Sequence, residues 1–303
     1  MSRAVSFSRY GSPEVLEVID VAEPHADAGQ VRVTVRSAGL NPFDVKVRHG
    51  VLPKLVLPSR QGSEFAGVID EVGADAGDWQ VGDEVLGWIG RGAQAEHVVV
   101  PASSIAPKPA ALDWAIAGGV GLVGNTAKRS TASLSLGADD TVLVTGAAGG
   151  VGLLSAQLAR RTGATVIGTA SERHHEFLRG LGVTPVAYGS GMLDRLREAA
   201  PQGFTAALDN VGGDSIEAAL LLGIPPQRIN TIADHDAAEK YGLGSVGGGG
   251  KTAEELEELA TLVANGELVL PLRASYPLDE VRAAYEDLES GHGLGKIVLT
   301  LGD

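Results

Sequence analysis

The segment VLVTGAAGGVG at residues 142–152 joins an apolar run to Gly146, Gly149 and Gly152. The run predicts a buried strand, and a helical pattern begins near Val151. A dinucleotide-binding loop uses such glycines for a tight turn, close approach of the pyrophosphate, and close helix packing. The pyrophosphate then lies at the positive end of the helix. No Lys-Ser or Lys-Thr pair follows, which excludes a P-loop. The expected loop contacts are Gly146, Ala148, Gly149, Gly150 and Val151.

The end of the next predicted strand, residues 164–170, indicates which dinucleotide is bound. An NAD site usually has Asp or Glu there for the ribose 2′-hydroxyl. Here Ser171 ends the strand, and Arg173 and His174 follow, which can hold a 2′-phosphate by charge-assisted hydrogen bonds. Glu172 would have to point away or pair with a neighbour. The alternative is a solvated turn of mixed charge, but the pattern favours NADPH.

Composition limits the remaining chemistry. The 303 residues include no cysteine, so disulfides and thiolate metal sites are excluded, and redox chemistry must come from a cofactor. A formal charge of −14 disfavours a nucleic-acid partner. The N-terminal segment lacks the apolar stretch of a signal peptide, and no run reaches the length of a membrane span. We therefore expect a cytoplasmic protein with no membrane partner.

The elements that position these residues differ between the two parts of the chain. Up to about residue 120, short strands alternate with turns rich in glycine, proline and acidic residues, which predicts a mostly antiparallel β domain. From Thr141 onward, short apolar strands alternate with helices, which predicts an α/β domain with a doubly wound parallel sheet. The strands predicted in the first part are Arg3–Phe7, Leu16–Val21, Gln30–Ser37, Phe65–Val72, Glu84–Trp88 and Ala95–Val100.

Several segments together resemble the medium-chain dehydrogenases/reductases, specifically their zinc-independent quinone oxidoreductase and enone reductase branch. They are AGLNPFDVKVRHG (38–50), QGSEFAGVIDEVG (61–73), VGDEVLG (81–87), VLVTGAAGGVG (142–152), LDNVGG (208–213) and GKIVL (295–299). The resemblance implies a GroES-like substrate domain of residues 1–119 completed by 266–303. It also implies a Rossmann NADPH-binding domain of residues 120–265, an active site between the two domains, and a homodimer.

The same resemblance bears on metal use. Zinc-dependent alcohol dehydrogenases of this superfamily have a cysteine near position 41 and a Gly-His-Glu segment near position 62. This chain has Asn41, and Ser63 stands between Gly62 and Glu64. Neither Asn nor Ser is a good zinc ligand, so we expect no metal. Without a Lewis acid, alcohol oxidation is disfavoured, whereas hydride addition to an electrophilic quinone or enone remains feasible.

Asn41, Asp44 and Lys46 lie together in NPFDVK and are the candidate catalytic residues. By resemblance, Asn41 contacts the nicotinamide ribose or the substrate region. Hydride delivered to the β-carbon of an enone leaves negative charge on the carbonyl oxygen, and the Lys46 ammonium could stabilise that charge or donate a proton. Asp44 could hold Lys46. The alternative is a short helix that Asn41 caps, with a solvated lysine.

Further cofactor contacts follow from the resemblance alone. They are Thr126, Tyr188, Asn210, Val211, Ile232, Ala233 and Lys296. We expect an NADPH-dependent reductase of quinones or α,β-unsaturated carbonyls that acts on a small molecule. Two alternatives remain: an enoyl reductase dedicated to one pathway, and a non-catalytic NADPH-binding protein.

Overall fold

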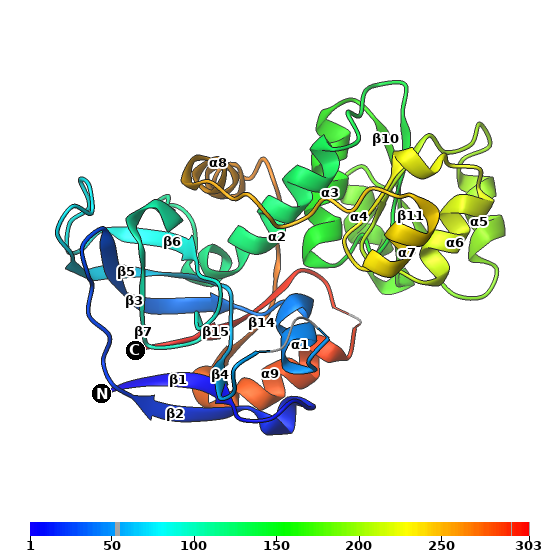
Figure 1. Cartoon of the computed structure of the whole chain (residues 1–303). Helices are drawn as coiled ribbons and strands as arrows, with labels where there is room; N and C mark the ends of the chain where they lie inside the picture. Colours follow the sequence, from blue (N-terminus) through cyan, green and yellow to red (C-terminus); the bar gives the residue numbers. More distant parts are fainter. Residues whose placement is uncertain (52–54, 292, 303) are drawn as a thin grey trace. The chain divides into compact units, whose positions relative to one another are not determined.

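The computed structural model describes residues 1–51, 55–291 and 293–302 (Figure 1). It divides into two compact units, one formed by Met1–Leu122 with Lys251–Asp303 and the other by Val123–Gly250. Helix α2 (Trp114–Ala132) contributes residues to both units. No described helix combines the length and hydrophobicity that a membrane span requires.

The first unit is built on a mostly antiparallel sheet. The order of the strands is β14-β15-β3-β5-β6-β8, and β7 also pairs with β3. Burial alternates along most of β3, as expected for a sheet with one face on the core. Strands β14 and β15 come from the end of the chain, and β15 runs antiparallel to β3 (Figure 1). The bounds are β3 Gln30–Gly39, β5 Glu64–Val72, β6 Glu84–Trp88, β7 His97–Pro101, β8 Ile105–Pro107, β14 Leu272–Pro277 and β15 Lys296–Thr300.

A smaller sheet and three helices complete this unit. The order of the small sheet is β2-β1-β4. The hydrophobic core of the first unit joins Phe7 from the small sheet to Phe65 and Leu299 from the larger sheet and to the fully buried Tyr285 on α9. The bounds are β1 Ser2–Phe7, β2 Glu17–Val21, β4 Ser59–Arg60, α1 Pro42–Arg48, α8 Ala253–Ala264 and α9 Val281–Glu289, with 3-10 turns at Pro13–Val15, Ala102–Ser104 and Leu278–Glu280.

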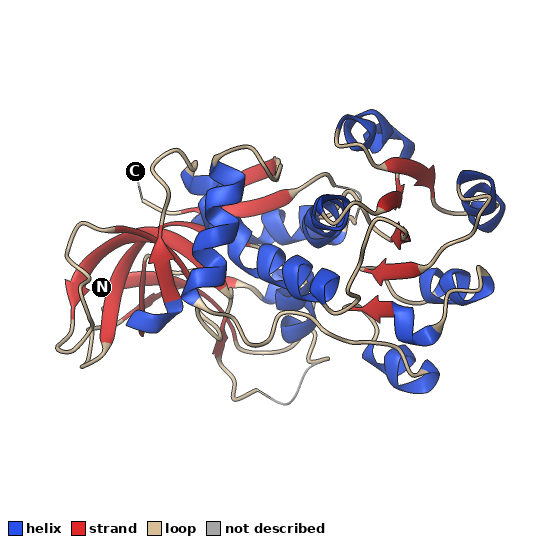
Figure 2. Cartoon of the chain, turned by 90° about the horizontal axis from the view of Figure 1, so that it is seen from above, coloured by secondary structure: helices blue, strands red, loops and turns tan. Residues whose placement is uncertain are grey.

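The second unit is a parallel sheet with helices on its connections, as the secondary-structure colours of Figure 2 show. The order β11-β10-β9-β12-β13 corresponds to 3-2-1-4-5 along the chain, which is the doubly wound order. The sheet is buried on both faces, so its strands are short apolar runs. The bounds are β9 Thr141–Val144, β10 Thr165–Ala170, β11 Thr184–Ala187, β12 Ala206–Asp209, β13 Ile229–Thr231, α3 Gly150–Arg161, α4 His175–Gly180, α5 Met192–Ala199, α6 Asp214–Leu221 and α7 His235–Tyr241, with 3-10 turns at Glu172–His174 and Pro226–Arg228.

The structural division differs from the predicted domain boundaries in one helix. The sequence analysis placed residues up to 265 with the nucleotide domain, whereas α8 belongs to the first unit. The physical reason is packing: α8 contacts β8, and its buried Leu256 lies against Gly121 in the first part of α2. A helical pattern that follows a β–α alternation does not reveal which sheet the helix covers.

Candidate active site

The glycine loop occupies the carboxyl end of β9. Gly146 has a φ of +61°, a left-handed conformation that favours glycine. A Cβ on Gly152 would lie 2.2 Å from the carbonyl oxygen of Gly146, so only glycine allows α3 to approach β9 this closely. Helix α3 begins at Gly150, one residue before the predicted start. The geometry therefore gives the first and third glycines of the pattern the steric roles expected of them.

A buried carboxylate, Asp209, connects three strand ends around this loop. It accepts hydrogen bonds from the hydroxyls of Thr145 at 2.7 Å, Ser215 at 2.5 Å and Thr231 at 2.6 Å. The Gly212 amide also donates to it, at 3.0 Å. Asp209 thus fixes the carboxyl ends of β9, β12 and β13, where doubly wound sheets bind ligands. The sequence analysis quoted this residue in LDNVGG but gave it no role.

The predicted contacts after β12 and β13 lie at the same edge of the sheet. The Asn210 amide donates to the Thr145 carbonyl at 2.9 Å, and Val211 is 59% exposed. Ile232 and Ala233 directly follow Thr231, whose hydroxyl accepts from the Ala233 amide. Val211 therefore has an apolar surface free to meet a ligand.

The predicted contacts that flank the sheet lie on other elements. Tyr188 follows β11 and is 49% exposed, whereas Thr126 is buried in α2. Ser171 directly follows β10 and precedes the turn Glu172–His174, in which Arg173 Nε donates to His174 Nε2 at 3.2 Å. Arg173 and Glu172 are both exposed. The guanidinium of Arg173, which was predicted to hold a 2′-phosphate, therefore lies beside the carboxylate of Glu172 in the turn that follows β10.

The predicted catalytic segment begins α1 in the first unit. Asn41 precedes the helix, and its backbone amide donates to Asp44 Oδ2 at 3.0 Å, as in a capping box. Asp44 Oδ1 accepts from the Ser63 hydroxyl at 2.9 Å. Both acceptor atoms of this carboxylate therefore face the cluster around Asn41, and Lys46 lies half-buried two residues further along the helix.

A buried ion pair holds the Asn41 side chain. Glu64 and Lys296 are 1% and 3% exposed, and their charged atoms lie 3.0 Å apart. The Asn41 amide donates to Glu64 Oε1 at 2.8 Å, and Lys296 Nζ donates to Asn41 Oδ1 at 2.7 Å and to the Leu40 carbonyl at 2.8 Å. Because an ammonium has three donors, Lys296 uses all of them here. A direct contact with a cofactor would require Lys296 to give up one of these bonds.

Burial changes the acidity of Asp44. The pKa of Asp44 is raised from 3.8 to about 6, chiefly because burial removes its carboxylate from water, and the nearby Glu64 charge acts in the same direction. The hydrogen bond from Ser63, the Lys296 charge and the Asn41 amide act in the opposite direction. Asp44 therefore changes charge within the range of pH in which many enzymes work.

A second polar layer supports α1 from the end of the chain. The fully buried Tyr285 hydroxyl accepts from the amides of Gln61 at 3.2 Å and Gln94 at 2.9 Å. Arg48 lies 5.1 Å from the Tyr285 ring centroid and pairs with Glu289 on α9. Burial raises the pKa of Tyr285 well above its usual value of 10.0, so its hydroxyl keeps its proton. The Tyr285 hydroxyl therefore acts as a neutral hydrogen-bond partner for Gln61 and Gln94.

The sequence analysis missed the partners of Asn41, although a signal was present. Glu64 opens the strand EFAGVIDEV, whose first four residues are buried and carry no other charge, and Lys296 opens KIVLT, whose first four residues are likewise buried. A charge in a buried strand requires an opposite charge nearby. Two buried strands that each carry one charge of opposite sign therefore predict that Glu64 and Lys296 form an ion pair. Among the described residues, no group of three or more His, Cys, Asp or Glu is arranged to hold a metal ion.

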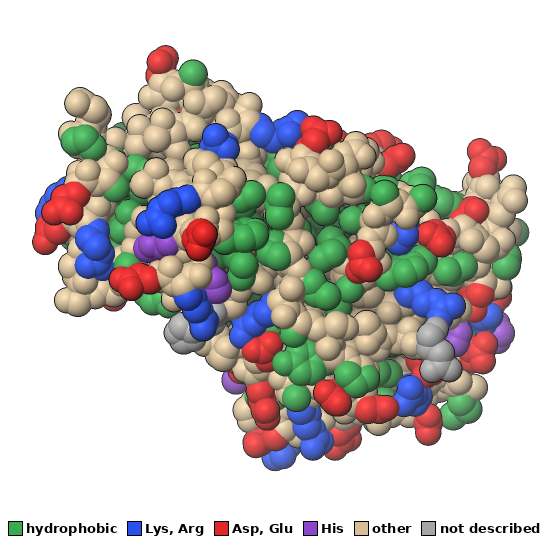
Figure 3. Space-filling model, turned by 180° about the vertical axis from the view of Figure 1, so that it is seen from behind, with side chains coloured by type: hydrophobic (Ala, Val, Ile, Leu, Met, Phe, Trp, Pro, Cys, Tyr) green, Lys and Arg blue, Asp and Glu red, His purple; other side chains and the backbone are tan. Residues whose placement is uncertain are grey.

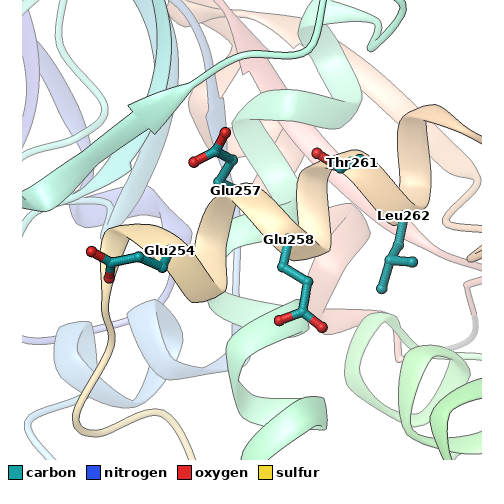
Figure 4. Close-up of a pocket in the computed structure, with 5 residues that line it drawn as sticks. All are labelled: Glu254, Glu257, Glu258, Thr261 and Leu262. Carbon is teal, nitrogen blue, oxygen red and sulfur yellow. The ribbon is translucent and has the colours of Figure 1, made fainter.

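The surface also carries a hollow along α8 (Figure 4). It is lined by Glu254, Glu257, Glu258, Thr261 and Leu262. All of them come from one helix, and the three exposed carboxylates carry the same charge. This arrangement is a solvated helix face and does not bring different chemical groups together.

A doubly wound sheet with a glycine loop, combined with an antiparallel β unit, defines the two-domain class of medium-chain dehydrogenases/reductases. Residues 27–110 match the alcohol dehydrogenase GroES-like domain, and residues 181–299 match the zinc-binding dehydrogenase family. The quinone oxidoreductase of Pseudomonas aeruginosa is 30% identical over 335 residues, covering 99% of both chains. The chain belongs to the quinone oxidoreductase branch of this family of oxidoreductases.

Two further relatives describe the range of this similarity. The structure of Escherichia coli quinone oxidoreductase complexed with NADPH superposes with a TM-score of 0.86 at 26% identity, covering 99% of this chain and 100% of that one. Polyketide synthase GfsB from Streptomyces halstedii is 33% identical over 293 residues. That match covers 91% of this chain and 5% of the synthase, so the chain spans a small part of that relative.

Proposed function

We propose that this protein is an NADPH-dependent reductase that transfers hydride to a quinone or an α,β-unsaturated carbonyl. The observation that carries the proposal is the glycine loop at the end of β9, with Ser171 and Arg173 at the end of the neighbouring strand. The similarity to an E. coli quinone oxidoreductase that binds NADPH supports it.

The chain's own groups fit this cofactor. The Gly146 turn and the start of α3 would receive the pyrophosphate, because backbone amides at a helix N-terminus favour negative charge. Ser171, Arg173 and His174 would hold the 2′-phosphate. The remaining predicted contacts, Thr126, Tyr188, Asn210, Val211, Ile232 and Ala233, would surround the rest of the dinucleotide. When bound, NADPH would supply the hydride.

The buried cluster of the first unit would position the reacting groups. Glu64 and Lys296 fix the Asn41 side chain, and Asp44 fixes its backbone. Asn41 would then face the nicotinamide region in one orientation, and Lys296 would act on the cofactor through Asn41. Lys46 is proposed to supply positive charge to the acceptor oxygen. We further propose that the reaction needs no zinc, because Asn41 and Ser63 are weak zinc ligands already engaged in hydrogen bonds.

A second candidate is an enoyl reductase dedicated to one pathway. The similarity of this chain to part of polyketide synthase GfsB favours it. Such an enzyme would use the same cofactor and the same hydride chemistry on a larger, carrier-linked enone. A cytoplasmic homodimer is proposed for either function.

The test is consumption of NADPH by the purified protein with a simple quinone, a simple enone and an enoyl thioester in parallel. We expect turnover with one of the three classes and transfer of deuterium from stereospecifically labelled NADPH to the product. For an enone, the label should appear on the β-carbon. Tight NADPH binding without consumption of any acceptor would instead identify a non-catalytic NADPH-binding protein.

A further inference from the structure

Lys251 stands directly before α8, and its position is fixed by that helix. Thr252 caps α8 by accepting a hydrogen bond from the Glu255 amide at 3.2 Å. The helix is then anchored in the first unit by Leu256, Leu259 and Ala260, all buried. The backbone of Lys251 is therefore held by a structured element, although it follows the glycine run 247–250.

The Lys251 side chain lies over an aromatic ring beside the polar cluster. Its Nζ is 6.0 Å from the centroid of the Trp88 ring, and both side chains are half-buried. Trp88 is the direct cross-strand partner of Glu64 in the β5–β6 pair. Because directly opposite residues of a sheet point to the same face, Lys251 lies on the face that carries Glu64.

The Lys251 ammonium lacks a neutralising partner. Among the described residues it forms no ion pair, and the carboxylates that act on its charge are Glu64 and Asp44. Glu64 already accepts from Lys296, Asn41 and the Leu122 amide, and Asp44 accepts from Ser63 and the Asn41 amide. Lys251 is thus held near two occupied carboxylates, with donors free for another acceptor.

We propose that Lys251, with the Trp88 ring beside it, is the catalytic group that binds the oxygen of a planar conjugated acceptor and protonates it. This inference rests on the proposed function, and it replaces Lys46 by Lys251 as the group that supplies positive charge to the acceptor oxygen. A lone lysine after four glycines has no motif around it, so the sequence pattern does not indicate this role.

A hydride leaves the nicotinamide C–H bond of NADPH, which would become NADP⁺, and forms a C–H bond at the acceptor carbon. The displaced π electrons move onto the carbonyl oxygen as negative charge. The Lys251 ammonium stabilises that charge, its N–H bond breaks, and the proton completes the enol or hydroquinone. Water then returns a proton to the neutral amine. Partial burial lowers the pKa of Lys251 against the opposing effects of the Glu64 and Asp44 charges, which favours proton donation.

The first test measures binding of 4-nitrophenolate, an aromatic oxyanion, by its absorbance change on the full chain with and without NADP⁺. We expect Lys251→Met to weaken binding about ten- to a hundredfold, the effect of losing one charge-assisted hydrogen bond. Lys240→Met is the matched control, because Lys240 lies 4.6 Å from the Tyr241 ring centroid in the other unit. Wild-type protein that does not bind the probe, or equal binding by Lys251→Met, would overturn the proposal.

The second test is the pH profile of kcat. The wild-type rate should fall at a pH below the usual lysine pKa, Lys251→Arg should lose that alkaline limb, and Lys251→Met should be slow at every pH. A Lys46→Met variant that loses the limb while Lys251→Met keeps it would assign the role to Lys46 instead. Probe binding that depends on Lys251 without turnover of any acceptor would contradict the proposed function and leave the oxyanion site standing.

Discussion

Asp44 shows how burial makes one residue sensitive to pH. Its pKa rises from 3.8 to about 6 on folding, so the folded state holds a proton that the unfolded state has already released between these values. The resulting stabilisation is complete below pH 3.8 and is lost as the pH rises through about 6. A shift of this size corresponds to roughly 3 kcal/mol.

We therefore expect the free energy of unfolding of the wild-type protein to decrease by up to roughly 3 kcal/mol between about pH 4 and pH 6. Asp44→Asn should remove this decrease. Urea unfolding of both proteins across this range measures it. Ser63→Ala is the matched comparison, because it removes a hydrogen bond that lowers the Asp44 pKa, and should move the decrease to higher pH. Parallel curves for wild type and Asp44→Asn would show that Asp44 is not the titrating group.

Arg173 carries the proposed selectivity for NADPH. Loss of one charged hydrogen bond to a phosphate costs roughly 1.5–3 kcal/mol, or about ten- to a hundredfold in affinity. Arg173→Ala should weaken NADPH by this factor and leave NADH nearly unchanged, as fluorescence titration with each cofactor would measure. Arg179→Ala, an exposed change on the adjoining α4, should affect neither. Equal losses for both cofactors would remove the basis of the assignment.

For single residues, the sequence predicted Asn41 and Asp44 as site residues but did not predict that Glu64 and Lys296 hold the Asn41 side chain. The motif NPFDVK is local, whereas Glu64 lies 23 residues from Asn41 and Lys296 lies 232 residues from Glu64. Local patterns show that a residue is polar and spaced for a helix. They do not show which distant charge compensates it, and that pairing decides whether Lys296 can reach a ligand directly.

The close packing of α3 on the glycine loop depends on Gly152. Gly152→Ala would place a Cβ 2.2 Å from the Gly146 carbonyl oxygen, which is backbone and cannot turn aside. We expect a loss of about 1–3 kcal/mol in stability and much weaker NADPH binding, because the loop and helix must separate. Gly137→Ala is the control, since no atom lies within 4 Å of its added Cβ. Thermal unfolding and cofactor titration of both variants measure this, and equal behaviour would exclude the steric role.

The parallel sheet was predictable as an element because each of its strands is an apolar run followed by a helical pattern. The six strands predicted in the first part of the chain were also found, with shifts of up to two residues at their ends, whereas β4 and β8 were not predicted. A strand was predicted to begin at Ala95, but the observed strand β7 begins at His97. The difference arises because Ala95 forms an isolated bridge to Ala4. The predicted placement of α8 with the nucleotide domain differs from the division into compact units for another reason. Its amphipathic pattern fixes a buried face but not the partner of that face.

The chain as a whole carries a formal charge of −14, and Figure 3 shows acidic side chains spread over the face in view, with Lys and Arg among them. Such a charge favours solubility and repels polyanions. Anionic cofactors must therefore be attracted locally, at groups such as Arg173. We accordingly expect NADPH affinity to fall with ionic strength only modestly.

Activity should survive removal of metal ions. The motivation is a chain of 303 residues without cysteine, with Asn41 and Ser63 where zinc-dependent relatives carry ligands. Chelator treatment followed by elemental analysis and an NADPH assay tests this, and added zinc should not raise the rate. Stoichiometric zinc whose removal abolishes turnover would contradict the proposal.

The late position of β15 in the chain has a consequence for biosynthesis. This strand pairs with Ser37–Gly39 of β3 and delivers Lys296 to Glu64, yet it is translated only after the whole nucleotide unit. Until it arrives, the nascent first unit keeps part of β3 unpaired and a carboxylate without its counterion. The intervening nucleotide unit, which is continuous in sequence, can finish folding first. During that interval the newborn chain exposes a strand edge suited to chaperones, and a ribosome stalled before residue 296 would release an aggregation-prone product.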